Sequence, residues 1–168
     1  MTQSHISNNV DQKPLPVSVV LNICGNDNED SLIRSLQSIR RQNHKPDEVL
    51  IVVDGPISER LQRIIQVFVK SVSFSVEQID LPIAAGLWNA RNVGIHAAEH
   101  ELVAVHDADD VMHPDRLRIQ LNYFESAEID VLGSPVYEFD AISERVLGLR
   151  MLAGNDLLTR KMLWQNVI

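Results

Sequence analysis

The sequence has little cysteine, few aromatic residues and no long hydrophobic run. Its 168 residues include one cysteine, Cys24, and aromatic residues make up 5% of the chain. A single thiol cannot form an intrachain disulfide, which excludes a small secreted disulfide scaffold and favours the cytoplasm. Because no apolar run approaches about 18 residues, we expect no membrane-spanning helix. Attachment to the inner face of the membrane stays an alternative.

Basic residues are outnumbered by acidic ones. Fifteen Lys and Arg stand against 23 Asp and Glu, for a formal net charge of -8. This sign disfavours binding through nucleic-acid phosphates, so we expect no nucleic-acid partner. The hydrophobic fraction of 45% is typical of a folded chain. Residues 1–14, which are rich in Ser, Asn and Gln, predict a flexible leader, and one domain is expected over 15–168.

Short β-branched runs alternate with helical patterns after the leader. Strands are predicted over 17–23, 49–53, 74–79 and 102–105, with helices beginning near Asp30, Ser58, Gly86 and Pro114. This alternation predicts an α/β fold with a mostly parallel sheet, whose ligands would bind at the carboxyl ends of its strands. Beyond residue 130, the segments 131–139 and 146–151 predict two less regular added strands.

An acidic tetrapeptide, Asp107-Ala108-Asp109-Asp110, follows the fourth predicted strand. Extended backbone would direct Asp107 and Asp109 to one side and turn His106 and Ala108 away. Carboxylates so close repel one another unless a cation offsets them, and Mg²⁺ binds through one or two carboxylates plus water and phosphate oxygens. The alternative is an acidic turn that caps the next helix. A zinc site with His106 and His113 is disfavoured, because His106 turns away.

The seven glycines form neither a dinucleotide fingerprint nor a P-loop. A bound diphosphate would therefore need a metal ion, which agrees with the acidic tetrapeptide. Asn26 follows the first strand, and Asp54 ends the second. Asp54 has two interpretations. It accepts a hydrogen bond from the N–H of a base or from a ribose hydroxyl, or it forms an ordinary Asp-Gly turn. Cys24 is predicted to be a small buried residue and not a nucleophile.

The segment from Gly86 to Gly94 opens the third predicted helix. Gly86 would allow a ligand to approach the backbone closely, and Gly94 would let the helix pack tightly on the sheet. Arg91 has three interpretations. It reaches toward a phosphate, it reaches toward Asp107, or it is an ordinary surface arginine.

The sequence resembles the family 2 glycosyltransferases of the GT-A type. The matching elements occur in the family's order and extend to about Phe139: the strand 17–23, Val52-Val53-Asp54-Gly55, the Ala90-Arg91-Asn92-x-Gly94 core, the tetrapeptide 107–110, and His113-Pro114-Asp115-Arg116-Leu117. The resemblance implies a Rossmann-like three-layer sandwich with a mostly parallel sheet.

The resemblance also implies an activity. The donor would be a nucleotide-diphosphate sugar, usually UDP-linked, with Mg²⁺ or Mn²⁺ on its diphosphate. Asp54 would contact the base, Arg91 would lie near the diphosphate, Asp107 would meet the ribose or the sugar, and Asp109 would ligate the metal. The sugar would pass with inversion to a hydroxyl of a glycan, a lipid-linked sugar or a protein.

Two departures from the family pattern bear on the activity. Asn22-Ile23-Cys24-Gly25 stands where the family often has an aromatic residue that stacks on the base. No acidic residue stands in the context of the family's catalytic base. We expect that base beyond Ile168, with Asp140, Glu144 and Asp156 as the remaining candidates, and therefore expect donor binding without useful transfer.

Three other functions are weighed against this one. A module that binds a nucleotide sugar without turnover would need the same donor site. A sugar-nucleotide pyrophosphorylase would need a glycine-rich basic loop after the first strand, which residues 24–28 do not supply. A phosphotransferase with an Asp-x-Asp nucleophile would carry that motif after the first strand and not after the fourth.

Overall fold

The computed structural model describes residues 15–140, 143 and 145–150. The predicted leader lies outside these residues, as do Glu144 and Asp156. Contacts divide the chain after Ser126 into two compact units, so the region predicted as one domain contains both. Each unit is described by itself. No helix in the described ranges is long and apolar enough to cross a membrane.

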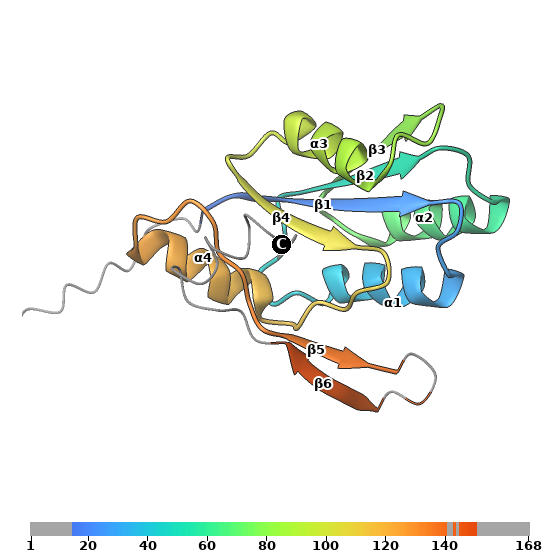
Figure 1. The fold of residues 1–168 in the computed structure, drawn as a ribbon. Helices are drawn as coiled ribbons and strands as arrows, with labels where there is room; N and C mark the ends of the chain where they lie inside the picture. The colour runs from blue at the N-terminus through green and yellow to red at the C-terminus, as the bar shows by residue number, and fades with distance from the viewer. Residues whose placement is uncertain (1–14, 141–142, 144, 151–168) are drawn as a thin grey trace, which may run out of the picture. The chain divides into compact units, whose positions relative to one another are not determined.

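The first unit alternates strands and helices. Its elements are β1 (Val17–Cys24), α1 (Glu29–Arg40), β2 (Glu48–Asp54), α2 (Glu59–Ser71), β3 (Ser75–Leu81), α3 (Leu87–Ala97), β4 (Leu102–Asp107) and α4 (Arg116–Ser126). The strands form one sheet in the order β3-β2-β1-β4, and every neighbouring pair is parallel. Figure 1 shows this arrangement, which confirms the predicted α/β fold with a parallel sheet.

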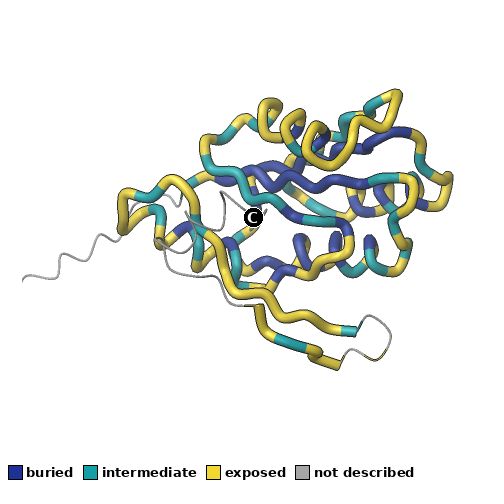
Figure 2. Tube along the Cα trace, in the orientation of Figure 1, coloured by how far each residue is buried: buried dark blue, intermediate teal, exposed yellow. Residues whose placement is uncertain are grey.

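Helices cover both faces of the sheet in three layers. Leu21 and Ile51 belong to the core that also contains the buried side chains of α1 and α2. Val20 and Val52 face the other way and pack with Ala90 of α3. Figure 2 shows β1 buried and the outer surface of α3 exposed. A Cβ at Gly94 would lie 2.5 Å from Val20 Cγ1, so α3 packs on the sheet as tightly as predicted.

The ends of two helices differ from the sequence prediction. Asn28 caps α1 by accepting a hydrogen bond from Ser31 N, whereas Asp30 was predicted as the cap. Asp30 lies in the first turn, where its charge suits the helix dipole. Pro114 lies in a turn, and α4 begins two residues later at Arg116. Ser58 caps α2 as predicted.

The second unit contains a two-stranded antiparallel hairpin of β5 (Val136–Phe139) and β6 (Val146–Arg150). It confirms parts of the two added strands, but residues 131–135 form no strand, and residue 151 lies outside the described ranges. Asp140 belongs to the turn, where its Oδ1 accepts from the backbone and the hydroxyl of Ser143.

Polar side chains of α1 and of the two residues that follow Arg41 hold the end of β4 and the segment that leads to α4. We call Ser35, Ser38, Gln42 and Asn43 the α1 clamp. Ser35 contacts the last two residues of β4, and Ser38 Oγ accepts a hydrogen bond from Met112 N at 3.0 Å. Gln42 and Asn43 contact the segment from His113 to Leu117.

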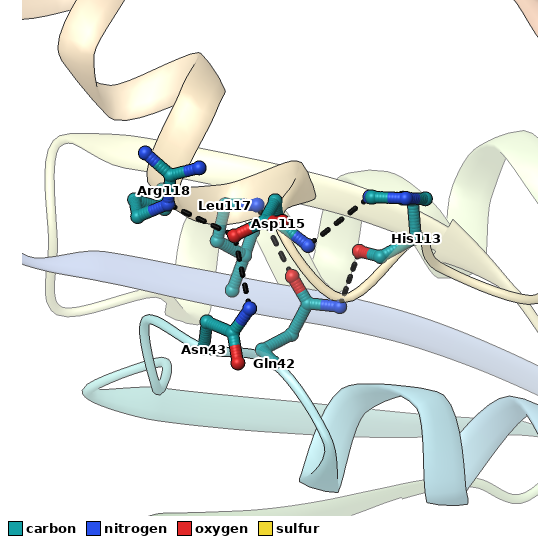
Figure 3. Close-up of polar contacts among 6 residues, drawn as sticks. All are labelled: Gln42, Asn43, His113, Asp115, Leu117 and Arg118. Carbon is teal, nitrogen blue, oxygen red and sulfur yellow. Dashed lines mark hydrogen bonds and ion pairs between the residues drawn. The ribbon is translucent and has the colours of Figure 1, made fainter.

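Gln42 is 0% exposed and bridges two backbone groups (Figure 3). Its Nε2 donates to His113 O at 2.8 Å, and its Oε1 accepts from Leu117 N at 3.1 Å. Leu117 is the second residue of α4, so Gln42 caps a helix to which it does not belong. Asn43 adds a bond from its backbone N to Pro114 O. The start of α4 is thereby fixed to the end of α1.

Ser35 fixes the end of β4. Its hydroxyl lies 3.0 Å from His106 Nε2 and donates to Asp107 O at 3.1 Å. Because the single hydroxyl proton goes to the carbonyl, Nε2 of His106 carries a proton and donates to Ser35 Oγ. Burial, and then the charge of Arg116, lower the pKa of His106 to about 3. His106 is therefore neutral in the folded protein near pH 7.

We expect Gln42→Leu to destabilise the fold. The substitution keeps the size of the side chain but leaves Leu117 N without its partner, and a buried unpaired donor costs about 1–3 kcal/mol. Urea unfolding at pH 7 measures the free energy of unfolding. Gln37→Leu makes the same change at an exposed position of α1 and should have little effect. Equal losses in the two variants would contradict the capping role of Gln42.

We expect His106 to make stability depend on pH. The unfolded chain binds a proton at this histidine below pH 6.5, whereas the folded chain leaves it neutral down to about pH 3. The free energy of unfolding therefore falls as pH falls through this window, by at most about 1.4 kcal/mol per pH unit. Urea unfolding at pH 7 and pH 5 should show a smaller difference for His106→Gln than for the parent. The exposed-site control His96→Gln should keep the parental difference, and an unchanged difference in His106→Gln would refute this role.

Candidate functional site

Three strands carry polar residues to the same edge of the sheet. β2 ends at Asp54 and β4 at Asp107, and both strands pair with β1. Asp54 is in register with Cys24, and Asp107 with Asn22. Because parallel strands end at one edge, the two aspartates flank β1 there. The sequence predicted this gathering.

Asp54 ties the end of β2 to the loop that precedes α3. It is 8% exposed. Its Oδ1 accepts from Ala85 N at 2.6 Å and its Oδ2 from Gly86 N at 2.9 Å. Gly55 follows with a positive φ of 82°, and a Cβ there would lie 2.9 Å from Ala84 N. The Asp-Gly pair therefore does more than form a local turn, because it fixes a second loop.

Gly86 is the N-cap of α3 and has a φ of 87°, a backbone conformation that residues other than glycine rarely adopt. A Cβ at this position would meet no atom within 4 Å. The space beside the backbone is open. Gly86 therefore has the room that the predicted close approach of a ligand requires.

The loop after β1 lies against the loop after β2. A Cβ at Gly25 would lie 2.7 Å from Pro56 O. Asn26, a predicted binding residue, is exposed on this loop, and Asp27 Oδ2 accepts from Cys24 N at 2.7 Å. Cys24 is half-buried and not buried as predicted, because it is the last residue of its strand.

Arg91 reaches the acidic segment. Its Nη2 lies 2.6 Å from Asp107 Oδ1, and its side chain is 12% exposed. The guanidinium also lies 5.2 Å from the ring centroid of Trp88, at cation–π distance. An ordinary surface arginine is thus excluded. Of the three interpretations of Arg91, the structure shows the contact with Asp107. The positive charge of Arg91 therefore offsets the negative charge of Asp107.

The acidic tetrapeptide is a turn and not an extension of the strand. Asp110 N donates to Asp107 O at 3.2 Å, which closes the turn. The prediction of extended backbone is therefore wrong beyond Asp107. His106 and Ala108 do face inward, with 3% and 6% exposure. Asp109 is exposed.

A second arginine stands on the other side of the turn. Arg116 Nη2 donates to Val105 O at 3.1 Å, and Nε donates to Gln120 Oε1 at 3.2 Å. Burial lowers the pKa of Arg116, while the charges of Asp110 and Asp107 raise it. The sequence did not single out Arg116 as part of the site, although it lies in the His113–Leu117 motif.

The segment before α4 is also held by polar contacts (Figure 3). Hydrogen bonds from Asn43 and then Arg118 lower the pKa of Asp115. Asp115 N donates to His113 Nδ1 at 3.2 Å. Sequence reasoning missed Gln42 and Asn43, because nothing in a local pattern links them to residues more than 70 positions away.

The side chains fit some metals and not others. No group of three His, Cys, Asp or Glu that could hold a metal occurs among the described residues. His106 bonds to Ser35, and His113 accepts from a backbone N, so the zinc interpretation gains no support. Asp107 and Asp109 offer hard oxygen atoms at a solvent-accessible turn. Mg²⁺ accepts such a set, with water and phosphate oxygens as its other ligands. Mn²⁺ also suits carboxylate and water ligands.

Comparison with characterised sequences places these features in a family. The model of glycosyl transferase family 2 matches residues 18–167. The amylovoran biosynthesis glycosyltransferase AmsE of Erwinia amylovora is 30% identical over 141 residues, which cover 83% of this chain and 52% of AmsE. The Escherichia coli UDP-Gal:alpha-D-GlcNAc-diphosphoundecaprenol beta-1,3-galactosyltransferase is 30% identical over 124 residues, 73% of this chain and 44% of that enzyme. The chain spans about half the length of these relatives.

Solved structures share the fold. S. aureus TarS 1-349 in complex with UDP-GlcNAc superimposes with a TM-score of 0.58 at 21% identity, over 67% of this chain and 32% of that one. The mannosyltransferase PcManGT from Pyrobaculum calidifontis, in complex with GDP-Man and Mn2+, gives 0.53 at 20% identity, over 64% and 33%. With its parallel sheet, its loops at the carboxyl edge and its match over residues 18–167, the chain belongs to glycosyl transferase family 2 and has the GT-A fold.

Proposed function

We propose that the chain binds a nucleotide-diphosphate sugar, UDP-linked, at the carboxyl edge of β1, β2 and β4, as the donor part of an inverting glycosyltransferase. The observation that carries this proposal is the convergence of Asp54, Arg91 and Asp107 at that edge. Membership of the family supplies the reaction class.

Each side chain has a proposed role toward the donor. Asp54 contacts the base, since each of its oxygens has lone pairs beyond the one bonded to the 85–86 backbone. Asp107 meets the ribose or the sugar, and Arg91 lies near the diphosphate. Asn26 and Gly86 border the same space from two loops.

A divalent ion, Mg²⁺ or Mn²⁺, would be held by Asp109 with Asp107. When bound, it would offset the charge of the diphosphate and stabilise the charge that develops on the leaving nucleotide. The chain itself supplies the placement of Asp107, because Arg91 binds its side chain and Ser35 binds its carbonyl. One solved structure of similar fold, the mannosyltransferase PcManGT, contains Mn2+ together with GDP-Man.

The names of similar proteins support the donor and one acceptor class. TarS was solved in complexes with UDP and with UDP-GlcNAc. The Escherichia coli relative is named for UDP-Gal and a sugar linked to diphosphoundecaprenol. A lipid-linked sugar is therefore the acceptor class that we propose first, ahead of a free glycan or a protein. Such an acceptor would bring the enzyme to the inner face of a membrane, in the cytoplasm.

We assign no residue of this chain as the catalytic base. Asp140, one of three candidates, accepts hydrogen bonds from Ser143 within the turn of the β5–β6 hairpin. The other two candidates, Glu144 and Asp156, lie outside the described residues. The proposed roles therefore concern donor binding.

We expect UDP to bind much more tightly with Mn²⁺ than with EDTA, and Asp109→Ala to abolish the difference. The carboxylates of the acidic turn otherwise repel the diphosphate. Titration calorimetry with UDP, GDP, dTDP and CDP, with and without the metal, measures both effects and ranks the bases.

The matched control for Asp109→Ala is Glu125→Ala, which removes one exposed carboxylate from α4. It should keep the parental metal dependence. Asp109 is itself exposed, so its removal should leave the melting temperature of the free protein unchanged or slightly raised. Equal affinity for UDP with Mn²⁺ and with EDTA in the parent would remove the metal from the proposal.

We expect Asp54→Ala to weaken UDP binding without changing its metal dependence. Loss of a hydrogen bond to a charged group costs about 1.5–3 kcal/mol, which corresponds to roughly 10- to 150-fold in the dissociation constant. The ratio of affinities with Mn²⁺ and with EDTA should stay as in the parent, because the base lies away from the metal. An unchanged dissociation constant would restrict Asp54 to holding the 85–86 loop.

A further inference from the structure

Two buried side-chain atoms in the described part of the chain have no hydrogen-bond partner: Asn22 Oδ1 and Arg91 Nε. One is an acceptor and the other a donor. Buried polar atoms nearly always have a partner, either in the protein or in an ordered water molecule. An unpaired acceptor and an unpaired donor, both buried near the proposed donor site, suggest that one interaction satisfies both atoms.

Asn22 is linked to two residues near Arg91, namely Leu87 on the same helix and Asp107, to which Arg91 binds. It is 8% exposed, and it is in register with Asp107 on the neighbouring strand. Its Nδ2 donates to Leu87 O at 3.4 Å. Leu87 begins α3 and precedes Arg91 by four residues, about one helical turn. Arg91 extends from α3 to Asp107, so its guanidinium approaches the strand position next to Asn22.

We propose that Asn22 is a positioning residue for Arg91. Its Oδ1 accepts a hydrogen bond from one buried water molecule, which in turn accepts from Arg91 Nε. The guanidinium is then fixed at Nε by Asn22 and at Nη2 by Asp107. Its remaining N–H groups are available to the diphosphate. This role rests on the proposed function, because it matters only if Arg91 and Asp107 bind the donor.

A purely structural role would have a different signature. The one hydrogen bond that Asn22 makes with its side chain is long, and its oxygen is unpaired. If its oxygen had no partner at all, replacement by a leucine of similar size would leave the stability of the fold unchanged or raise it, and UDP binding would not change. If Asn22 positions Arg91, the same replacement leaves the buried Nε–H without its link to Asn22, so UDP binding weakens and the fold loses some stability.

The test is a double-mutant cycle on UDP binding with Mn²⁺. Asn22→Leu should weaken binding by about tenfold or more, as expected for loss of a hydrogen bond to a charged group. The loss in free energy of unfolding caused by Asn22→Leu should be smaller in the Arg91→Lys background than in the parent, because lysine has no Nε–H to leave unpaired. Arg91→Lys removes Nε, so adding Asn22→Leu to it should cause little further loss. Asn122→Leu, at an exposed position of α4, is the matched control and should bind as the parent does.

A second measurement tests the proposal without a substitution at Asn22. In ¹H–¹⁵N spectra of the parent, the Nε–H signal of Arg91, assigned by its absence in Arg91→Lys, should exchange with water more slowly than that of exposed Arg63. Equally fast exchange would overturn the proposal. So would parental UDP affinity in Asn22→Leu, or an undiminished loss in the Arg91→Lys background. Failure of the proposed function looks different, because the parent itself would then bind none of the four nucleotides.

Discussion

The hydrogen bonds of the α1 clamp are the constraint on which the proposed site depends. Ser35 binds the carbonyl of Asp107, and Gln42 binds the backbone on both sides of the turn that precedes α4. The acidic turn lies between these attachments. The turn leaves an edge strand of the sheet, and these bonds add to its own Asp110–Asp107 bond and to the ion pair between Arg91 and Asp107. Packing of α1 on the sheet core therefore fixes the position of the carboxylates.

Charge is the second requirement of the turn. Arg91 pairs with Asp107 from α3, and burial lowers the pKa of Arg116, an effect that the nearby charges of Asp110 and Asp107 partly offset. The protein as a whole carries a formal charge of -8. Two arginines at this turn thus offset repulsion in the free protein, and Asp109 remains exposed. A cation that binds Asp109 would therefore bind at a turn whose negative charge is already partly neutralised by these arginines.

The sequence predicted the parts of the fold that depend on local patterns. The parallel sheet, the cap at Ser58 and the tight packing of Gly94 follow from periodicity, capping chemistry and residue size. Gln42 was not predicted, because a buried glutamine is indistinguishable in sequence from an exposed one. Asn22 was missed for a related reason. It occupies a strand position, and only its pairing with β4 brings it beside Asp107.

Local hydrogen bonding also limited the prediction of the acidic tetrapeptide. Alternation along a strand places His106 inward correctly, but the Asp110–Asp107 bond ends the alternation at once. We propose that this turn and the two loops beside it form one donor site. Amide hydrogen exchange with and without UDP and Mn²⁺ measures whether these segments bind the donor together. We expect added protection at residues 22–26, 54–56, 84–91 and 107–110. Protection confined to other segments, or no added protection at saturating UDP, would exclude a donor site at this edge.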